Sequence, residues 1–235
     1  VKGLQEHSDK KVPKLSAHLE GYGLQKIDFG TLTKKQENFW KQYFLQELFP
    51  VLSPQIIDKR HPFPFLRNLE LYVGTMMKEG KNEKVTFGLI PISTQYERVI
   101  FIANEEEELT CFALVEELIL HFAHLAFGKA QMQDKCLFRV TRNADLSVEE
   151  GMFDHDLDYR EIMSELLKKR RKLAAVRLQF YGNPPIAIQS FLINKLLLPE
   201  EQCIYQPAPL ELSFLRKLAA RLKRIGDDSL FYPVE

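Results

Sequence analysis

The residues of this 235-residue chain that could carry chemistry begin with a histidine pair. His121 and His124 lie three residues apart in an apolar stretch, so on a helix both imidazoles could face one metal ion, with Cys111 or Cys136 as a further ligand. Nothing in the spacing fixes a third ligand. We therefore favour the alternative, in which both are partly buried histidines bonded to polar neighbours.

Acidic residues form a second group, at alternate positions before a helical pattern. Asp154, Asp156 and Asp158, with Glu165 further on, partly match a calcium-binding loop. Tyr159 stands where that loop requires glycine for its sharp turn. We therefore expect these carboxylates to complement the positive end of a helix dipole instead.

Five consecutive cations form a third group over residues 168–172. Such a run usually stabilises the carboxyl end of a helix and keeps that face solvated. The alternative is an anion-binding surface, because lysine and arginine are natural partners of phosphate oxygens.

The overall composition limits the classes of partner. The 32 basic and 32 acidic residues cancel, whereas proteins that bind nucleic acid through its phosphates carry a basic excess. We expect no nucleic-acid partner and only a local anion site. No apolar stretch reaches the ~18 residues that span a bilayer. The three widely spaced cysteines favour reduced thiols in a cytoplasmic protein.

Two helices are predicted to open the chain. Apolar spacing over residues 4–19 predicts the first, which the glycine at Gly21 ends. Thr33 and Gln36 have the form of a capping box and predict a second helix that ends near Pro50. Its aromatic stripe is predicted to be domain core: Phe39, Trp40, Tyr43 and Phe44.

From residue 69 the apolar pattern changes to period two. Residues 69–73 and 85–89 flank a polar turn and predict a β-hairpin. Further strands are predicted at 99–102, just before 114, at 136–142, at 175–180 and around 204, and helices at 114–127, 159–172, 186–197 and 210–225. The interleaving indicates an α+β fold, with a helical preface followed by a mixed β-sheet packed with helices.

Four long and unusual segments occur in order along the chain: YFLQELFPVLSP at 43–54, HPFPFLRNL at 61–69, FRVTRNADL at 138–146 and AAVRL at 174–178. Together they resemble the bacterial polyphosphate kinase family of the large, histidine-phosphorylated type. The resemblance runs from about residue 15 to the end of the chain, and several motifs in order are far more specific than one short pattern.

The resemblance implies an enzyme that reversibly transfers the terminal phosphate of ATP to inorganic polyphosphate through a phosphohistidine, with Mg²⁺. In that family the phosphorylated histidine and most of the ATP and Mg²⁺ contacts lie in domains that would follow Glu235. No family catalytic residue carries over to this chain. We therefore expect residues 1–235 alone to bind no cofactor and to be inactive.

The resemblance also implies a division of the chain. Residues 1–53 would end an N-terminal helical domain, residues 54–222 would form the head domain, and residues 223–235 would lead into a catalytic domain. Because an amphipathic pattern is already running at Val1, we expect the chain to belong to a longer polypeptide. The head domain would serve homodimer formation and wall part of the substrate channel. The alternative is a free-standing, non-catalytic interaction or anion-binding module.

Two arginines in the third motif are candidates for phosphate contact. Arg139 and Arg142 are an odd number apart, so on a regular strand they face opposite sides. Arg142 ends the strand and is the predicted polyphosphate contact, whereas Arg139 is expected to pair with an acidic neighbour. Lys168 and Lys169 are added as contacts if their helix end faces the channel.

Overall fold

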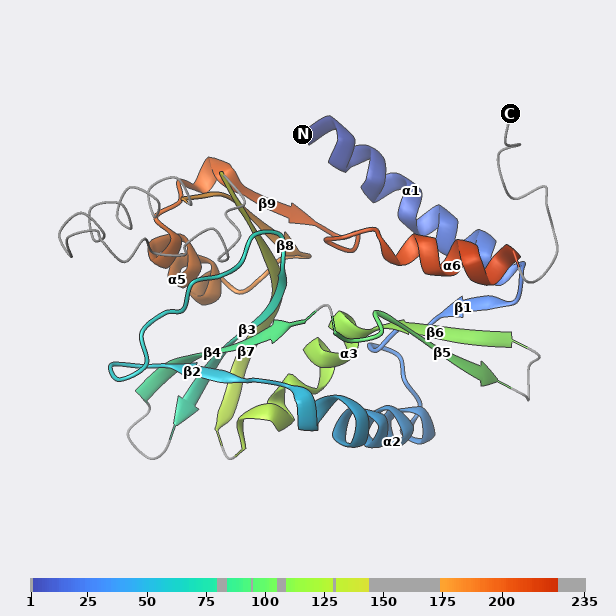
Figure 1. Cartoon of the computed structure of the whole chain (residues 1–235), viewed down its shortest axis with the longest axis horizontal. Helices are drawn as coiled ribbons and strands as arrows, with labels where there is room; N and C mark the ends of the chain where they lie inside the picture. Colours follow the sequence, from blue (N-terminus) through green and yellow to red (C-terminus); the bar gives the residue numbers. More distant parts are fainter. Residues whose placement is uncertain are drawn as a thin grey trace, which may run out of the picture.

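The strands of the chain are divided between two mixed sheets (Figure 1). The computed structural model describes residues 2–79, 84–93, 95–104, 109–128, 130–143 and 174–223. The larger sheet has the order β2 (Gln55–Ile57), β4 (Lys84–Ile92), β3 (Leu71–Glu79), β7 (Gln131–Arg142), β8 (Ala175–Tyr181) and β9 (Cys203–Gln206). The smaller has the order β1 (Leu24–Lys26), β6 (Leu109–Leu114) and β5 (Val99–Asn104). The predicted α+β class is confirmed, with two sheets in place of one.

The predicted hairpin is confirmed as the antiparallel pair β3 and β4. Two glycines allow the layers to pack closely on it. A Cβ on Gly74 would lie 2.8 Å from Cζ of Phe87, and one on Gly88 would lie 2.7 Å from Cζ of Phe127. A side chain at either position would therefore force its neighbours apart.

The helices before the larger sheet follow the predicted boundaries. α1 covers Lys2–Glu20 and is followed by Gly23 with a φ of 74°. α2 covers Lys34–Tyr43, and its capping box is present: the Gln36 amide donates to Thr33 Oγ1, and the Thr33 amide donates to the Gln36 side chain. The helical turns η1 (Phe44–Leu48) and η2 (Phe49–Val51) then carry the chain to Pro50 and beyond.

The later helices are α3 (Val115–Phe122) with the turn η3 (Ala123–Phe127), α5 (Ile186–Leu196), the turn η5 (Glu200–Gln202) and α6 (Phe214–Lys223). α6 begins four residues later than predicted. The carbonyl of Leu210 accepts a hydrogen bond from Arg139 Nη1, and the Ser213 amide donates to Glu211 Oε1. These contacts hold the chain in a non-helical course before Phe214. The helix predicted over 159–172 lies outside the described residues.

Three clusters of buried apolar residues join these elements in layers (Figure 1). The first lies between one face of the larger sheet and α2, η1, α3 and η3, and it takes in Ile100 and Ala113 of the smaller sheet. The second lies on the opposite face, where α5 packs. The third joins the smaller sheet to α1 and α6. The helical preface thus shares a core with the larger sheet, and the proposed boundary at residue 53 stays a prediction.

The aromatic stripe of α2 is only partly core. Trp40 and Phe44 are buried, but Phe39 is 48% exposed. Positions 40 and 44 are four apart and share one helix face, whereas position 39 is turned away by about 100°. Within the described residues, no helix combines the length and the apolar character needed to cross a membrane.

Trp40→Ala is predicted to lower the free energy of unfolding by about 3–5 kcal/mol, as truncation of a buried aromatic does. The indole ring lies 5.6 Å from the ring of Phe29 and 5.9 Å from that of Tyr43, centroid to centroid. Denaturant unfolding measures the loss. Phe39→Ala on the same helix is the control, and equal losses in the two variants would contradict this assignment of the core face.

Candidate functional site

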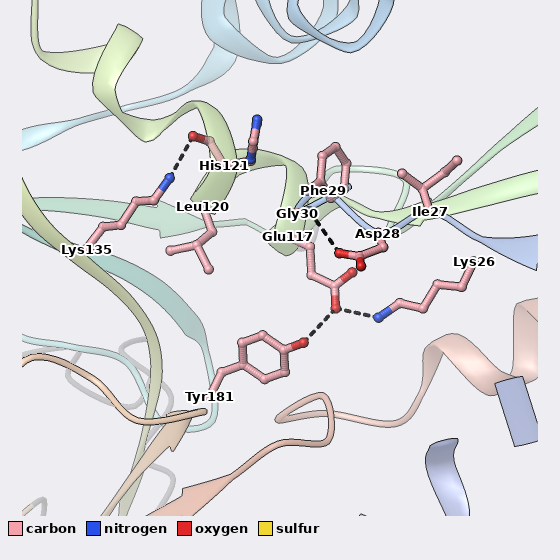
Figure 2. Close-up of a pocket in the computed structure, with 10 residues that line it drawn as sticks. All are labelled: Lys26, Ile27, Asp28, Phe29, Gly30, Glu117, Leu120, His121, Lys135 and Tyr181. Carbon is pink, nitrogen blue, oxygen red and sulfur yellow. Dashed lines mark hydrogen bonds and ion pairs between the residues drawn. The ribbon is translucent and has the colours of Figure 1, made fainter. Parts of the chain in front are cut away.

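A polar cavity of about 670 Å³ lies where the two sheets meet α3 (Figure 2). Its walls come from the segment that follows β1, from one side of α3, and from β7 and β8. The lining residues are Lys26, Ile27, Asp28, Phe29, Gly30, Glu117, Leu120, His121, Lys135 and Tyr181. Two of these residues are basic, two are acidic and one is a histidine. The cavity is therefore a candidate for binding a polar ligand.

The register of the smaller sheet places Lys26 beside the start of α3. Lys26 lies opposite Phe112 in the parallel pair of β1 and β6, and α3 begins three residues after Phe112. Lys26 Nζ is 2.6 Å from Glu117 Oε1, and the hydroxyl of Tyr181 donates to the same oxygen over 3.3 Å. Burial raises the pKa of Glu117, and the nearby Lys26 ammonium opposes this rise.

The opposite wall contains Lys135 and His121, and the Glu37 carboxylate of α2 contacts His121 from outside the lining. Lys135 Nζ donates to the carbonyl of His121 over 2.8 Å, and Nε2 of His121 lies 3.1 Å from both oxygens of Glu37. Burial lowers the pKa of Lys135, while the Glu37 charge opposes the decrease. The imidazole of His121 also packs against Phe29, with the ring centroids 5.4 Å apart.

These contacts pair several polar groups of the cavity with one another. Glu117 is bonded to Lys26 and to the Tyr181 hydroxyl, and His121 is bonded to Glu37. Figure 2 shows the Lys26 ammonium directed at Glu117 and the Lys135 ammonium directed at the His121 carbonyl. The lining contains two basic and two acidic residues, so the arrangement can hold a polar group.

No further metal ligand is grouped with the histidine pair among the described residues. His121 is bonded to Glu37, as the buried-histidine interpretation expects. The Cys111 thiol lies 3.9 Å from the Gln25 side-chain oxygen, and burial raises the pKa of the Cys136 thiol. Within the described ranges, no three His, Cys, Asp or Glu side chains are grouped as metal ligands would be.

Arg142, the predicted phosphate contact within the described residues, is not among the residues that line this cavity. Arg142 donates from Nε to the carbonyl of Leu66 over 2.6 Å, and its guanidinium lies 3.9 Å from the Phe65 ring centroid. Its backbone amide donates to Asn68 Oδ1. Arg142 therefore holds the proline-rich segment, and burial lowers the pKa of its guanidinium.

Of the other predicted site residues, Arg139 lies within the described part of the chain and the rest do not. Lys168, Lys169 and the acidic residues from Asp154 to Glu165 lie outside the described residues. Arg139 was expected to pair with an acidic neighbour, and this is wrong within the described part of the chain. Its Nη1 donates to the carbonyl of Leu210 over 2.7 Å. Arg139 and Arg142 do contact opposite sides of the sheet, because Leu210 belongs to the first apolar cluster and Leu66 to the second.

Sequence reasoning found His121 but not the other residues of the cavity. Lys26 and Glu117 are 91 residues apart, and Glu117 and Tyr181 are 64 apart. A local signal was the polar Lys135, which directly precedes the apolar residues 136–138 of β7. Period two places it on the same face as Leu137 and Arg139, but which element covers that face cannot be inferred from the pattern.

Comparison with known proteins gives a consistent set of similarities. The family model described as "Polyphosphate kinase middle domain" matches residues 35–218. A polyphosphate kinase of Bacillus anthracis is 33% identical over 222 residues, which cover 92% of this chain and 31% of that protein. One of Mycobacterium avium (strain 104) is 29% identical over 218 residues, which cover 90% of this chain and 30% of that protein. The chain thus spans about three tenths of the length of these curated relatives.

A solved structure shows the same fold. The crystal structure of polyphosphate kinase from Porphyromonas gingivalis matches with a TM-score of 0.64 at 16% sequence identity. The match covers 87% of this chain and 30% of that one.

The buried carboxyl group of the cavity predicts a pH dependence. Because the pKa of Glu117 is raised above its ordinary value of 4.5, the folded state keeps this proton to a higher pH than the unfolded chain does. Its contribution to stability is therefore full below the unfolded pKa and is lost as the pH rises through the folded pKa. The unfolding free energy of the wild type, relative to Glu117→Gln, is predicted to fall as the pH rises from the ordinary value of 4.5 through the raised pKa of the folded state.

Denaturant unfolding across this pH range is the measurement. Glu97→Gln is the matched control, because the Glu97 side chain is 63% exposed. Parallel pH curves for the wild type and Glu117→Gln would contradict the raised pKa.

Proposed function

The chain belongs to the polyphosphate kinase family, and from that premise we propose that it is the head region of an enzyme that reversibly transfers the terminal phosphate of ATP to inorganic polyphosphate. The family match over residues 35–218 is the observation that carries the proposal. The transfer would pass through a phosphohistidine located outside residues 1–235.

We propose that this chain contacts polyphosphate and takes part in homodimer formation. In the cavity, Lys26 is bonded to Glu117 and His121 to Glu37, and we propose that these residues form a wall. The described carboxylates offer no grouped set that fits Mg²⁺, so we propose that Mg²⁺ and ATP bind elsewhere in the enzyme. Arg142, with Lys168 and Lys169, is proposed to contact polyphosphate along the channel.

Homodimer formation and a cytoplasmic location complete the proposal. Ile186 and Leu197, at the two ends of α5, are 79% and 89% exposed, and we propose that they belong to the partner surface. The three cysteines are free and buried, which supports a reducing compartment. A native reading frame that stopped at Glu235 would favour the free-standing binding module instead.

Residues 1–235 alone are predicted to remain unlabelled when incubated with labelled ATP and Mg²⁺. The physical reason is that the proposed phosphohistidine lies outside residues 1–235, so the transfer would lack its nucleophile. Acid-labile, base-stable label would contradict the prediction. His61 would then be the first residue to replace, because Asp58 Oδ1 lies 3.0 Å from its Nδ1 and its side chain is 72% exposed.

Arg142→Ala in the full-length enzyme is predicted to weaken polyphosphate binding and to reduce its salt dependence, because a lost phosphate contact removes a released counterion. Arg142→Lys is the control that keeps the charge. Since Arg142 also bonds Leu66, the thermal midpoint is measured in parallel to separate folding from binding. Unchanged affinity and salt slope in Arg142→Ala would assign this arginine to structure. The same titration tests Lys168→Gln and Lys169→Gln.

A further inference from the structure

Two arginines of separate motifs project from one face of the larger sheet. In the antiparallel pair of β7 and β8, Arg139 lies opposite Gln179, and Thr141 lies opposite Arg177. Residues two apart on a strand share a face, and directly opposed residues do too. Arg139 and Arg177 are therefore diagonal neighbours on the side of the sheet that faces Leu210.

Neither guanidinium is neutralised by a carboxylate of the described residues. Arg139 donates to the carbonyl of Leu210, and Arg177 donates from Nε and Nη2 to the hydroxyl of Thr141 over 3.2 and 3.0 Å. Burial, followed by the positive charges of Arg177 and Arg98, lowers the pKa of Arg139. The pair holds two positive charges against neutral acceptors.

Arg98, the third cation of this region, is paired with carboxylates. Arg98 Nη2 lies 2.6 Å from Glu116 Oε1, and Arg98 also forms an ion pair with Glu211. Its charge is matched by two carboxylates from within the described residues. The unmatched charge is therefore confined to Arg139 and Arg177.

Two shielded polar atoms at the same place lack hydrogen-bond partners in the described structure. They are Nε of Arg139, a donor, and Oε1 of Gln179, an acceptor. Their residues are direct cross-strand partners. Buried polar atoms are nearly always bonded, so an unpaired donor and acceptor together indicate a missing partner that both accepts and donates.

We propose that Arg139 and Arg177 form a binding site for one phosphoryl group, with Gln179 accepting a hydrogen bond from a ligand hydroxyl or an ordered water. Guanidinium groups bind phosphate oxygens through two parallel N–H donors, and an oxyanion would relieve the repulsion between the two arginines. The phosphoryl group could belong to a polyphosphate chain or to a nucleotide. That identity rests on the proposed function, but the oxyanion site itself does not.

Thermal unfolding of the full-length protein with tripolyphosphate tests the site. Ionic strength is held constant with sodium chloride, and orthophosphate is titrated in a second series. A ligand that binds the folded state raises the midpoint according to its affinity. Arg177→Gln is expected to weaken the apparent affinity by about tenfold to a hundredfold, the usual effect of losing charge-assisted hydrogen bonds.

Arg216→Gln is the matched control. Arg216 is exposed on α6, and its replacement removes the same charge from the domain, so it should keep the wild-type affinity. Arg139→Gln is expected to match Arg177→Gln, and the double variant should lose less than the sum because both side chains share one anion. Arg177→Lys keeps the positive charge but lacks the two parallel N–H donors of the guanidinium, so its tripolyphosphate affinity should be intermediate. This variant still tests the site if Arg139→Gln fails to fold.

Steady-state kinetics distinguish the two sources of the phosphoryl group. A raised KM for polyphosphate with an unchanged KM for ATP in Arg177→Gln would assign the site to the polymer, and the reverse would assign it to the nucleotide. Wild-type tripolyphosphate affinity in Arg177→Gln and Arg177→Lys would overturn the site while leaving the proposed function intact. Arg177-dependent binding in a full-length protein that transfers no phosphate would support the site and contradict the proposed function.

Discussion

The buried contact between Arg98 and Glu116 joins the segment before β5 to the start of α3. Glu116 is 1% exposed at the start of α3, where the chain leaves β6 and turns onto the larger sheet. A carboxylate at this depth requires a bonded cation, and removal of one partner of such a pair typically costs about 3–5 kcal/mol. Arg98 also bonds the carbonyl of Glu211 and the hydroxyl of Ser213. One guanidinium therefore ties β5, α3 and the start of α6 together.

The neighbouring Glu117 extends this connection to the other side of α3. Its bond to Lys26 joins α3 to β1, and its bond from Tyr181 joins α3 to β8. Consecutive glutamates at the start of one helix thus engage both sheets. The first turn of a helix also favours negative charge, because the unpaired amides carry partial positive charge. The cavity exists because these contacts space α3 from the strands that line it.

The charged residues of the domain fall into two groups: those bonded within the fold, and those proposed to bind a ligand. The carboxylates of Glu116 and Glu117 are satisfied by cations of the chain. Arg142 is bound to a carbonyl and an aromatic ring and supports the proline-rich segment. Arg139 and Arg177, the proposed anion site, instead donate to neutral acceptors among the described residues.

The sequence by itself determined the elements whose cause is local. The capping box of Thr33, the period-two hairpin and the strand that carries Arg139 all follow from spacing over a few residues. Only the tertiary structure decided that the strands form two sheets, that Phe39 is exposed, and that a helix starts at Phe214 and not at 210. It also decided which charges meet. Periodicity records which side of an element is buried, whereas the partner of a buried charge depends on where distant segments come together.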